Sequence, residues 1–470
     1  MRRAARRGGV REGCGEKRGF KVALDAEVSA EVERLIGPEA ADALDFEAVE
    51  TAVRRHAFRV AAKVWQARLN ADHGDHSAPT LPCTCGGVAR YTGRREKTFT
   101  TALGEMTLSR AYYHCATCGH GWCPRDLSLG LAESSLSPAV TRMVGLVASA
   151  GSFEWSSKLL AELAGVEVVD RQVEREAEAL GREIDADERA EVEPAAPEEV
   201  APTLYVGLDG SGIPVRKEEV EGRAGKQPDG TAKTREAKTC VVWSAEGRDA
   251  KGRPVRDPGS ATYSSAIESV ATRDTDEVPA EFARRVLREA LRRGVDHAVR
   301  VVVLGDGAVW IWNLADLYFP QAVQVLDLFH AIEHLAAVGR AVYGPAGDLA
   351  QVWIKARADD LKEGRFEAVL TELRAHSKAH EEAGECLRYF ETNRRRMRYA
   401  EFRAQGLCVG SGVVEAACKT VVAARFKGAG MHWSVAGANA ILALRCSLLS
   451  GRFEDFWERR AERLRAAAGR

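Results

Sequence analysis

The chain has 470 residues, of which 45% are hydrophobic and 29% charged, with 11 cysteines and a formal net charge of −1. This length allows several domains with a substantial core, and the composition is that of an ordinary globular protein. We predict neither a membrane protein nor a secreted one, because no apolar run approaches the roughly 18 residues that span a bilayer and the Arg-rich first twenty residues lack the apolar stretch of a signal peptide.

The N-terminal part is predicted to be a basic tail followed by helices. Residues 1–20 are rich in Arg and contain no periodic apolar pattern, which favours a disordered tail. Within the next region, 21–78, apolar residues between Val28 and Asn70 recur at steps of three and four, which is typical of helices. This part of the chain contains no motif with recognisable chemistry.

The segment 79–128 combines strand-like stretches with two close pairs of cysteines. The pairs are Cys83-Thr-Cys85 and Cys115-Ala-Thr-Cys118. Zinc prefers a tetrahedral set of thiolates, and two tight turns that each offer two sulfurs supply such a set. Without a secretory signal, clustered cysteines bind metal more often than they form disulfides. We therefore predict a structural zinc site in a small β region. Three nearby residues are alternative ligands: His114, His120 and Cys123. Scattered core cysteines are the other interpretation.

Three helices are predicted in the region 129–184. The first starts at Ser137-Pro138, the second ends near Gly165, and the third starts at Asp170 and ends near Ile184. Two helices, a Gly-containing turn and a third helix form the helix-turn-helix pattern, which favours DNA binding. An ordinary three-helix bundle has the same pattern. Residues 185–202, rich in Glu, Ala and Pro, are predicted to be a linker.

Beyond the linker, apolar runs alternate with helical periodicity, so the fold class is α/β. Strands are predicted at 203–209, 239–246, 299–305 and 321–327, and helices at 279–293, 307–317 and 328–342. The Gly-, Lys- and Pro-rich stretch 214–262 is predicted to form a β-ribbon and exposed loops. Residues 345–405 are all helical in pattern, and 411–468 close the chain with further helices.

Three acidic residues stand where a strand or a turn ends. Asp209 follows the apolar run that starts at Leu204, Asp306 follows a similar run, and Glu415 lies in the first predicted helical turn after Gly410-Ser-Gly412. Burying a lone carboxylate at the end of a strand is costly, and a divalent cation removes that cost. We predict that the three carboxylates hold a pair of magnesium or manganese ions. For any one of them, a loop Asp or a helix N-cap is the alternative.

Asp327 and His330, at the start of the predicted helix 328–342, form an Asp-x-x-His element. The same predicted helix contains the sequence His330-Ala-Ile-Glu333-His334, which matches the H-x-x-E-H pattern of inverted zinc metallopeptidases. Histidines four residues apart share a helix face and can both bind zinc. A peptidase would leave the three acids and the cysteines unexplained.

Basic and aromatic residues follow Glu415. Lys419, Arg425 and Lys427 are predicted to contact DNA phosphates, and Trp433 to stack on a base. The alternative is a solvated loop with Trp433 in the core.

Five short segments, in order, resemble the bacterial insertion-sequence transposases of the DDE class, and the ISKra family most. They are Leu208-Asp-Gly-Ser-Gly212, Val303-Leu-Gly-Asp-Gly-Ala-Val-Trp310, Val325-Leu-Asp-Leu-Phe-His330, Gly410-Ser-Gly-Val-Val-Glu415 and Arg425-Phe-Lys-Gly-Ala-Gly-Met-His-Trp433. The CxC…CxxC segment is also similar to that family. Together these segments span about residues 80–455.

The resemblance implies a multidomain α/β protein with an RNase H-like mixed-sheet core. The core would consist of 203–330 and 409–470, interrupted by an all-helical insertion at 331–408. The resemblance also implies catalytic roles for five residues: Asp209, Asp306 and Glu415 as metal ligands, and His330 and Asp327 beside them. His330 is expected to contact the DNA backbone or the scissile phosphate, or to order Asp327. A structural histidine at a strand–helix junction is the alternative.

The implied activity is hydrolysis and strand transfer at inverted-repeat ends. The expected partners are double-stranded DNA, both terminal repeats and target, and further copies of the chain as a homodimer or higher oligomer. A cytoplasmic, nucleoid-associated bacterial location without membrane contact is expected. Near-neutral net charge implies localised DNA contacts. A zinc-containing DNA-binding protein with an inactive core is a second possibility, the HxxEH metallopeptidase a third, and a nuclease without end specificity a fourth.

Overall fold

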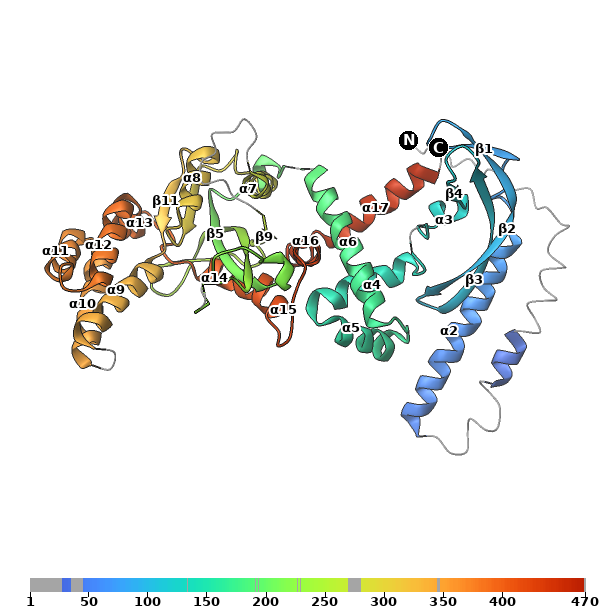
Figure 1. Ribbon diagram of the computed structural model, residues 1–470, viewed down its shortest axis with the longest axis horizontal. Helices are drawn as coiled ribbons and strands as arrows, with labels where there is room; N and C mark the ends of the chain where they lie inside the picture. Colours follow the sequence, from blue (N-terminus) through green and yellow to red (C-terminus); the bar gives the residue numbers. More distant parts are fainter. Residues whose placement is uncertain are drawn as a thin grey trace, which may run out of the picture. The chain divides into compact units, whose positions relative to one another are not determined.

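The computed structural model describes residues 28–34, 45–132, 134–190, 192, 194–225, 227–228, 230–268, 280–344 and 347–468 (Figure 1). The predicted basic tail lies outside these residues. The chain divides into two compact units. The first unit is Met1–Ala148 with Phe153–Glu176 and Trp457–Arg470, and the second unit is Ser149–Ser152 with Ala177–Phe456.

A long helix and a four-stranded antiparallel sheet dominate the first unit. The helix is α2 (Phe46–Ala71), which begins at Asp45, whose side chain accepts a hydrogen bond from the amide of Ala48. The strands, in the order β1-β2-β3-β4, are β1 (Thr80–Pro82), β2 (Val88–Thr101), β3 (Gly104–Cys115) and β4 (Gly121–Trp122). Gln66 and Asn70 of α2 accept hydrogen bonds from amides of β3. The strands predicted between the cysteines are therefore present, with α2 beside them.

Helices follow the sheet: α3 (Pro124–Ser128), α4 (Pro138–Ala150), α5 (Phe153–Leu159) with a π-helical turn (Leu160–Ala164), and α6 (Asp170–Ala190). Gly165 ends the second of the three predicted helices at φ 67°, a conformation that favours glycine. The predicted linker was wrong at its start, because α6 continues to Ala190. The extension is rich in Asp, Glu, Arg and Ala, and its charged side chains are held by ion pairs within the second unit.

A mixed five-stranded sheet forms the centre of the second unit. Its strands, in the order β11-β10-β5-β6-β9, are β11 (Val323–Leu326), β10 (Arg300–Gly305), β5 (Thr203–Pro214), β6 (Thr234–Ser244) and β9 (Thr262–Ala266). β10 pairs in parallel with β5 and with β11, whereas β6 is antiparallel to β5 and β9. The α/β class is confirmed. Strand β9 was missed, but the predicted ribbon is present as β7 (Gly247–Arg248) and β8 (Pro254–Val255).

The remaining helices are α7 (Glu281–Arg292), α8 (Val309–Tyr318), α9 (Leu328–Tyr343), α10 (Asp348–Lys362), α11 (Phe366–His376), α12 (Glu381–Asn393), α13 (Tyr399–Ala404), α14 (Gly412–Ala417), α15 (Ala424–Phe426), α16 (Val435–Leu449) and α17 (Phe453–Ala468). A second π-helical segment, Cys418–Ala423, joins α14 to α15. The described residues between α9 and α14 contain helices but no strand, as predicted, and Figure 1 draws α10 to α13 as one orange group. None of the described helices is both long and apolar enough to cross a bilayer.

The central strand β5 is covered on both faces, because five successive residues, from Leu204 to Leu208, are all buried. Trp243 of β6 stacks on Tyr205 with ring centroids 5.1 Å apart. Gly207 lets α14 approach closely, since a Cβ there would lie 2.3 Å from Cγ2 of Val414. Side chains alternate along a strand, so Asp209 shares the face of Gly207 that α14 covers.

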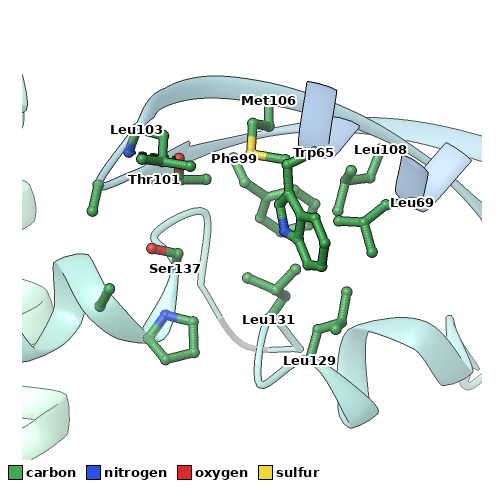
Figure 2. A pocket seen from close by; sticks show the side chains of 13 residues that line it. Trp65, Leu69, Phe99, Thr101, Leu103, Met106, Leu108, Leu129, Leu131 and Ser137 are labelled. Carbon is green, nitrogen blue, oxygen red and sulfur yellow. Dashed lines mark hydrogen bonds between the residues drawn. The ribbon is translucent and has the colours of Figure 1, made fainter. Parts of the chain in front are cut away.

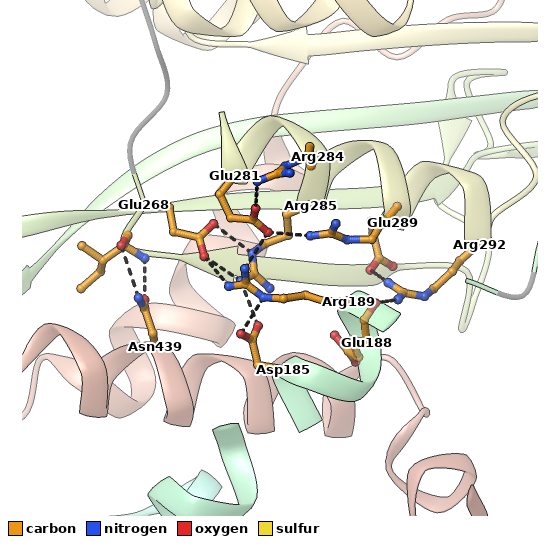
Figure 3. A network of polar contacts seen from close by, with 12 residues as sticks. Asp185, Glu188, Arg189, Glu268, Glu281, Arg284, Arg285, Glu289, Arg292 and Asn439 are labelled. Atoms are coloured by element: carbon orange, nitrogen blue, oxygen red, sulfur yellow. Dashed lines mark hydrogen bonds and ion pairs between the residues drawn. The ribbon is translucent and has the colours of Figure 1, made fainter. Parts of the chain in front are cut away.

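A network of ion pairs joins α6, α7 and the residues just after β9 (Figure 3). Arg285 contacts Asp185 at 2.9 Å and Glu268 at 2.8 Å, and Arg189 contacts Glu268 at 2.9 Å. Only 7% of the Arg285 side chain is exposed. This network holds the C-terminal half of α6 against the sheet domain.

We predict that Arg285→Met destabilises the second unit, because it leaves the largely buried carboxylates of Glu268 and Asp185 with fewer cations. Removing one member of a buried ion pair costs about 3 kcal/mol, so urea unfolding of the full chain, followed by circular dichroism, should start at lower denaturant. Arg284→Ala, on the neighbouring and more exposed position, is the matched control and should leave the unfolding curve in place. An equal shift for both variants would show that the network adds no specific stability.

Candidate functional site

Asp209 and Asp306 lie next to each other at the same edge of the sheet. Gly305 of β10 pairs with Leu208 of β5, so the two aspartates occupy the next position on each of two parallel neighbouring strands. Burial raises the pKa of Asp209, and the nearby charge of Asp306 raises it further. One detail of the prediction was wrong, because β5 does not end at Asp209. It continues to Pro214 by pairing with β6.

The loop after Asp306 is held by a tyrosine from the helical segment. The hydroxyl of Tyr389, on α12, donates to the backbone carbonyl of Asp306 at 2.5 Å. Gly307 follows with φ 101°, and a Cβ there would lie 2.5 Å from the Tyr389 oxygen. The side chain of Asp306 accepts from the amide of Ala308 at 3.0 Å. Nothing in the sequence marked Tyr389, which is 83 residues from Asp306.

The helix that carries Glu415 lies over β5, but the Glu415 carboxylate is exposed. Cys418, one turn later, hydrogen-bonds to Asp209 through its thiol, and burial raises the pKa of that thiol strongly. The Glu415 side chain is 64% exposed and forms an ion pair with Lys419 at 2.9 Å. The oxygens of Asp209, Asp306 and Glu415 do not all lie within 4.8 Å of one another. The structure thus brings the two aspartates together and places the helix of the glutamate beside them.

Asp327 joins the start of α9 to the turn before α14. It is 5% exposed. One carboxylate oxygen accepts from the amides of Phe329, at 2.9 Å, and Ser411, at 3.1 Å, and the hydroxyl of Ser411 donates to the other oxygen. These bonds make Asp327 a residue that positions the Gly410–Gly412 turn.

His330 lies close enough to Asp209 that its charge lowers the pKa of that carboxyl, and its ring nitrogen is 3.3 Å from Glu333. His334 stacks on Tyr389 with centroids 4.2 Å apart, and burial, followed by the charge of His330, lowers its pKa. No third ligand joins the two histidines in a metal-sized cluster among the described residues. The contacts of this helix therefore give the peptidase alternative no support.

The predicted DNA contacts of Arg425 and Trp433 were wrong. Arg425 is 2% exposed and Trp433 7% exposed. The guanidinium lies over the indole ring, 4.9 Å from its centroid, and the indole NH donates to the Phe426 carbonyl at 3.3 Å. Burial lowers the pKa of Arg425 to about 10. Lys427 is exposed, and its Nζ donates to Ser211 of β5 at 2.9 Å, two residues after Asp209.

A buried arginine supports the π-helical segment beside Asp209. Arg445 of α16 is 8% exposed, and its guanidinium donates to the carbonyls of Val421, at 2.9 Å, and Thr420. A π-helical turn leaves backbone carbonyls without their usual partners, and such turns occur frequently at functional sites. Arg445 thereby fixes the segment from which Cys418 reaches Asp209. The sequence analysis did not single out Arg445.

The four predicted zinc ligands form a cluster in the first unit. The sulfur of Cys83 is 3.6 Å from that of Cys118, the sulfur of Cys85 is 3.7 Å from that of Cys115, and all four sulfurs lie within 4.8 Å of one another. A tetrahedron with zinc–sulfur bonds of about 2.3 Å has edges of roughly 3.8 Å. The cluster can therefore bind a metal such as zinc. The alternative ligands, Cys123, His114 and His120, are not members of it.

The turns of the cluster aim backbone amides at the sulfurs. The amide of Gly87 donates to the Cys85 sulfur at 3.4 Å. Hydrogen bonds from the backbone amides of Cys118 and then Thr117 lower the pKa of Cys115 to about 6. A thiolate at Cys115 is suited to a metal cation, whereas the pKa of the neighbouring Cys118 is raised to about 12.

A cavity of about 250 Å³ lies between α2, the β2–β3 hairpin and the loop before α4 (Figure 2). Apolar side chains such as Trp65, Phe99 and Leu131 line it. Its two hydroxyl groups, on Thr101 and Ser137, bond to nearby backbone. Among the described residues, no acid, base or thiol lines the cavity.

Comparisons with known proteins give a family match and several similar solved chains, one of which is described here. No curated protein matches the sequence. The Drosophila P element transposase strand transfer complex is similar at 9% sequence identity over 71% of this chain and 83% of that chain. The TM-score is 0.25, too low to support an argument. The sequence matches a family over residues 89–461, which is most of the chain. The chain therefore belongs to the family described as Uncharacterised protein family (UPF0236).

Proposed function

We propose that this protein is a DDE-type DNA transposase of the ISKra kind, which cleaves and joins DNA at the inverted-repeat ends of its insertion sequence. One observation carries the proposal. Asp209 and Asp306 stand on adjacent parallel strands, so close that the charge of Asp306 raises the pKa of Asp209. Two like charges in one half-buried place are unfavourable unless a cation joins them. This feature agrees with the family resemblance of the sequence.

The core in this proposal is RNase H-like, and its sheet supports that assignment. A central β5 lies between an antiparallel partner and a parallel one, and the acids occupy β5 and the end of β10. The region 331–408 is the helical insertion. Tyr389 of this insertion donates a hydrogen bond to the backbone carbonyl of Asp306.

The carboxylates of Asp209, Asp306 and Glu415 are the residues that would hold two magnesium or manganese ions. Their hard oxygens and mutual repulsion fit such ions. The ions supply activation of water or a 3′-hydroxyl and stabilisation of the leaving oxygen. For Glu415 to take part, its carboxylate must leave Lys419. Lys419 can then meet a DNA phosphate, and so can the exposed Lys427 once its Nζ leaves Ser211.

The remaining parts of the proposal concern DNA and zinc. Zinc at the four-cysteine cluster is structural and holds the ends of β2 and β3 together. The helices α4 to α6 form a helix-turn-helix-like region that binds the terminal repeats. His330 contacts the DNA backbone beside Asp209. The protein acts in the bacterial cytoplasm on double-stranded DNA as a homodimer or a larger assembly.

The inactive-core alternative is tested by removing the aspartates. We expect Asp209→Asn and Asp306→Asn each to abolish manganese-dependent nicking of DNA carrying the element's own ends, because each loses a metal ligand. The loss should be about a thousandfold or more, as for groups that stabilise a transition state directly. DNA binding, measured by a gel shift, should be unchanged. Nicking assays on both variants and wild type check this.

Asp296→Asn, at an exposed position of the same unit, is the matched control and should cleave normally. Wild-type protein that binds the ends but never cleaves them would instead support the DNA-binding protein with an inactive core. Cleavage of any DNA without end preference or joining would favour a nuclease.

Tyr389 is expected to position Asp306 without touching the metal. Tyr389→Phe keeps the ring against Gly307 but removes the hydroxyl that donates to the Asp306 carbonyl. Such a hydrogen bond is worth about 1 kcal/mol, which corresponds to roughly a fivefold change in the manganese concentration required. We therefore expect a higher manganese concentration for half-maximal nicking and unchanged DNA affinity. Titration of manganese in the nicking assay measures this.

The control for that titration is Tyr343→Phe, which removes a hydroxyl from a partly buried tyrosine of α9 that packs on Trp353. It should behave as wild type. A Tyr389→Phe variant with the normal manganese requirement would exclude a positioning role for the hydroxyl.

Zinc content tests the cysteine cluster. Protein grown with zinc should contain about one equivalent, and Cys115→Ser should lose it, because a tetrahedral site with three thiolates binds zinc far more weakly. Elemental analysis of the purified proteins checks the content. Cys123→Ser is the matched control, since Cys123 lies outside the cluster, and it should keep its zinc. Zinc-free wild type, or loss in both variants, would reject the site.

A further inference from the structure

One aromatic ring lies exposed at the start of α9. Phe329 is 62% exposed. Among the described residues of the second unit, every other Phe, Tyr or Trp side chain is buried or half-buried. The nearby apolar residues of the same helix, Leu328 and Ala331, are buried as well. Phe329 is therefore an aromatic side chain that the core of this unit does not use.

The register of three parallel strands places this ring at the edge where the two aspartates lie. β5, β10 and β11 set Asp209, Asp306 and Asp327 next to one another, because the residues just before them are paired. The amide of Asp327 also donates to the carbonyl of Gly305 at 2.9 Å. Phe329 comes two residues later, and its amide donates to the Asp327 carboxylate at 2.9 Å. In open α/β sheets, ligands bind outside the carboxyl ends of parallel strands, which is where this ring lies.

The turn before α14 holds the ring from one side. A Cβ on Gly410 would lie 2.7 Å from Cε2 of Phe329 and 3.0 Å from Cδ2, so the ring packs where a side chain is missing. The next residue of the turn, Ser411, donates its amide to Asp327 at 3.1 Å, which ties the turn to the start of α9. A ring that is already held loses less conformational freedom when a ligand binds. Its remaining surface is open to solvent.

We propose that Phe329 stacks on a nucleobase of the DNA end whose phosphate lies at the two aspartates, an inference that rests on the proposed function. The reacting group in that function is a phosphodiester, and the flat apolar surface nearest to it in DNA is a base. Every base has such a face, so an aromatic side chain can bind it without sequence preference. Inside a duplex the neighbouring bases cover both faces, so the stacked base is either the terminal one or one turned out of the helix. The sequence analysis assigned this stacking to Trp433, which is buried.

A double-mutant cycle with abasic DNA tests the contact. All proteins carry Asp306→Asn, so that a fluorescent duplex with the element's own end stays intact in manganese. One base at a time is removed on either side of the cleavage position. We expect one or two of these removals to weaken binding about tenfold, and Phe329→Ala to weaken binding of the intact end by a similar factor. Combining the two should cost nothing more, because both changes remove the same contact. Phe329→Tyr keeps the ring and should restore the affinity. Fluorescence anisotropy measures each one.

The matched control is Phe46→Ala, the same substitution at an 83% exposed position of the first unit, which should bind like the parent protein. Losses that add up in the combined measurement, or a Phe329→Ala variant with unchanged affinity for the intact end, would overturn the stacking. Either result would leave the proposed function in place if the chain with both aspartates still cleaves its ends. A protein that does not bind the intact end at all would overturn the proposed function together with this inference.

Discussion

The parallel pairing of β5 with β10 is the constraint on which the site depends. It sets Gly305 beside Leu208, and the next residue on each strand is an aspartate. Burial and like charge both oppose the ionised form of Asp209, so the fold tolerates an unfavourable arrangement there. A cation bound between the two carboxylates would remove this repulsion, and the proposed function rests on that argument.

Several residues from distant parts of the chain hold the surroundings of the two aspartates. Asp327 bonds to Ser411 and so fixes the turn before α14. Cys418 on that helical segment bonds to Asp209, and Tyr389 bonds to the backbone of Asp306. Each of these groups is buried or half-buried, and none of the bonds is local in sequence. The helical segment between the second and third acids is thus part of the site's support.

The sequence predicted most of the sheet because its strands are apolar runs that end in recognisable residues. The sequence also identified Asp209, Asp306 and the four cysteines as candidate metal ligands. Each belongs to a motif, a carboxylate after an apolar run or a close pair of cysteines, whose chemistry suits a metal ion. Strand β9 was missed because its residues, Thr262 to Ala266, include only one large apolar side chain and are held mainly by pairing with β6. Tyr389 was missed because its role arises from a contact across 83 residues, which no local pattern records.

Arg425 and Trp433 were predicted to contact DNA but are buried, and both errors have the same physical cause. That cause also affects how much positive charge the protein exposes. Arg425 was predicted to contact a DNA phosphate, but its guanidinium stacks on Trp433 inside the core. Two further arginines have similar internal roles. Arg445 donates hydrogen bonds to backbone carbonyls, and Arg285 forms ion pairs with carboxylates. Guanidinium groups are well suited to such buried roles because they are weakly hydrated and offer five donors. Basic residues counted from sequence therefore overestimate the charge available to DNA. Among the described residues that were predicted to contact DNA, Lys419 and Lys427 are exposed. Under the proposed function, DNA contacts made by these two lysines would be few and local.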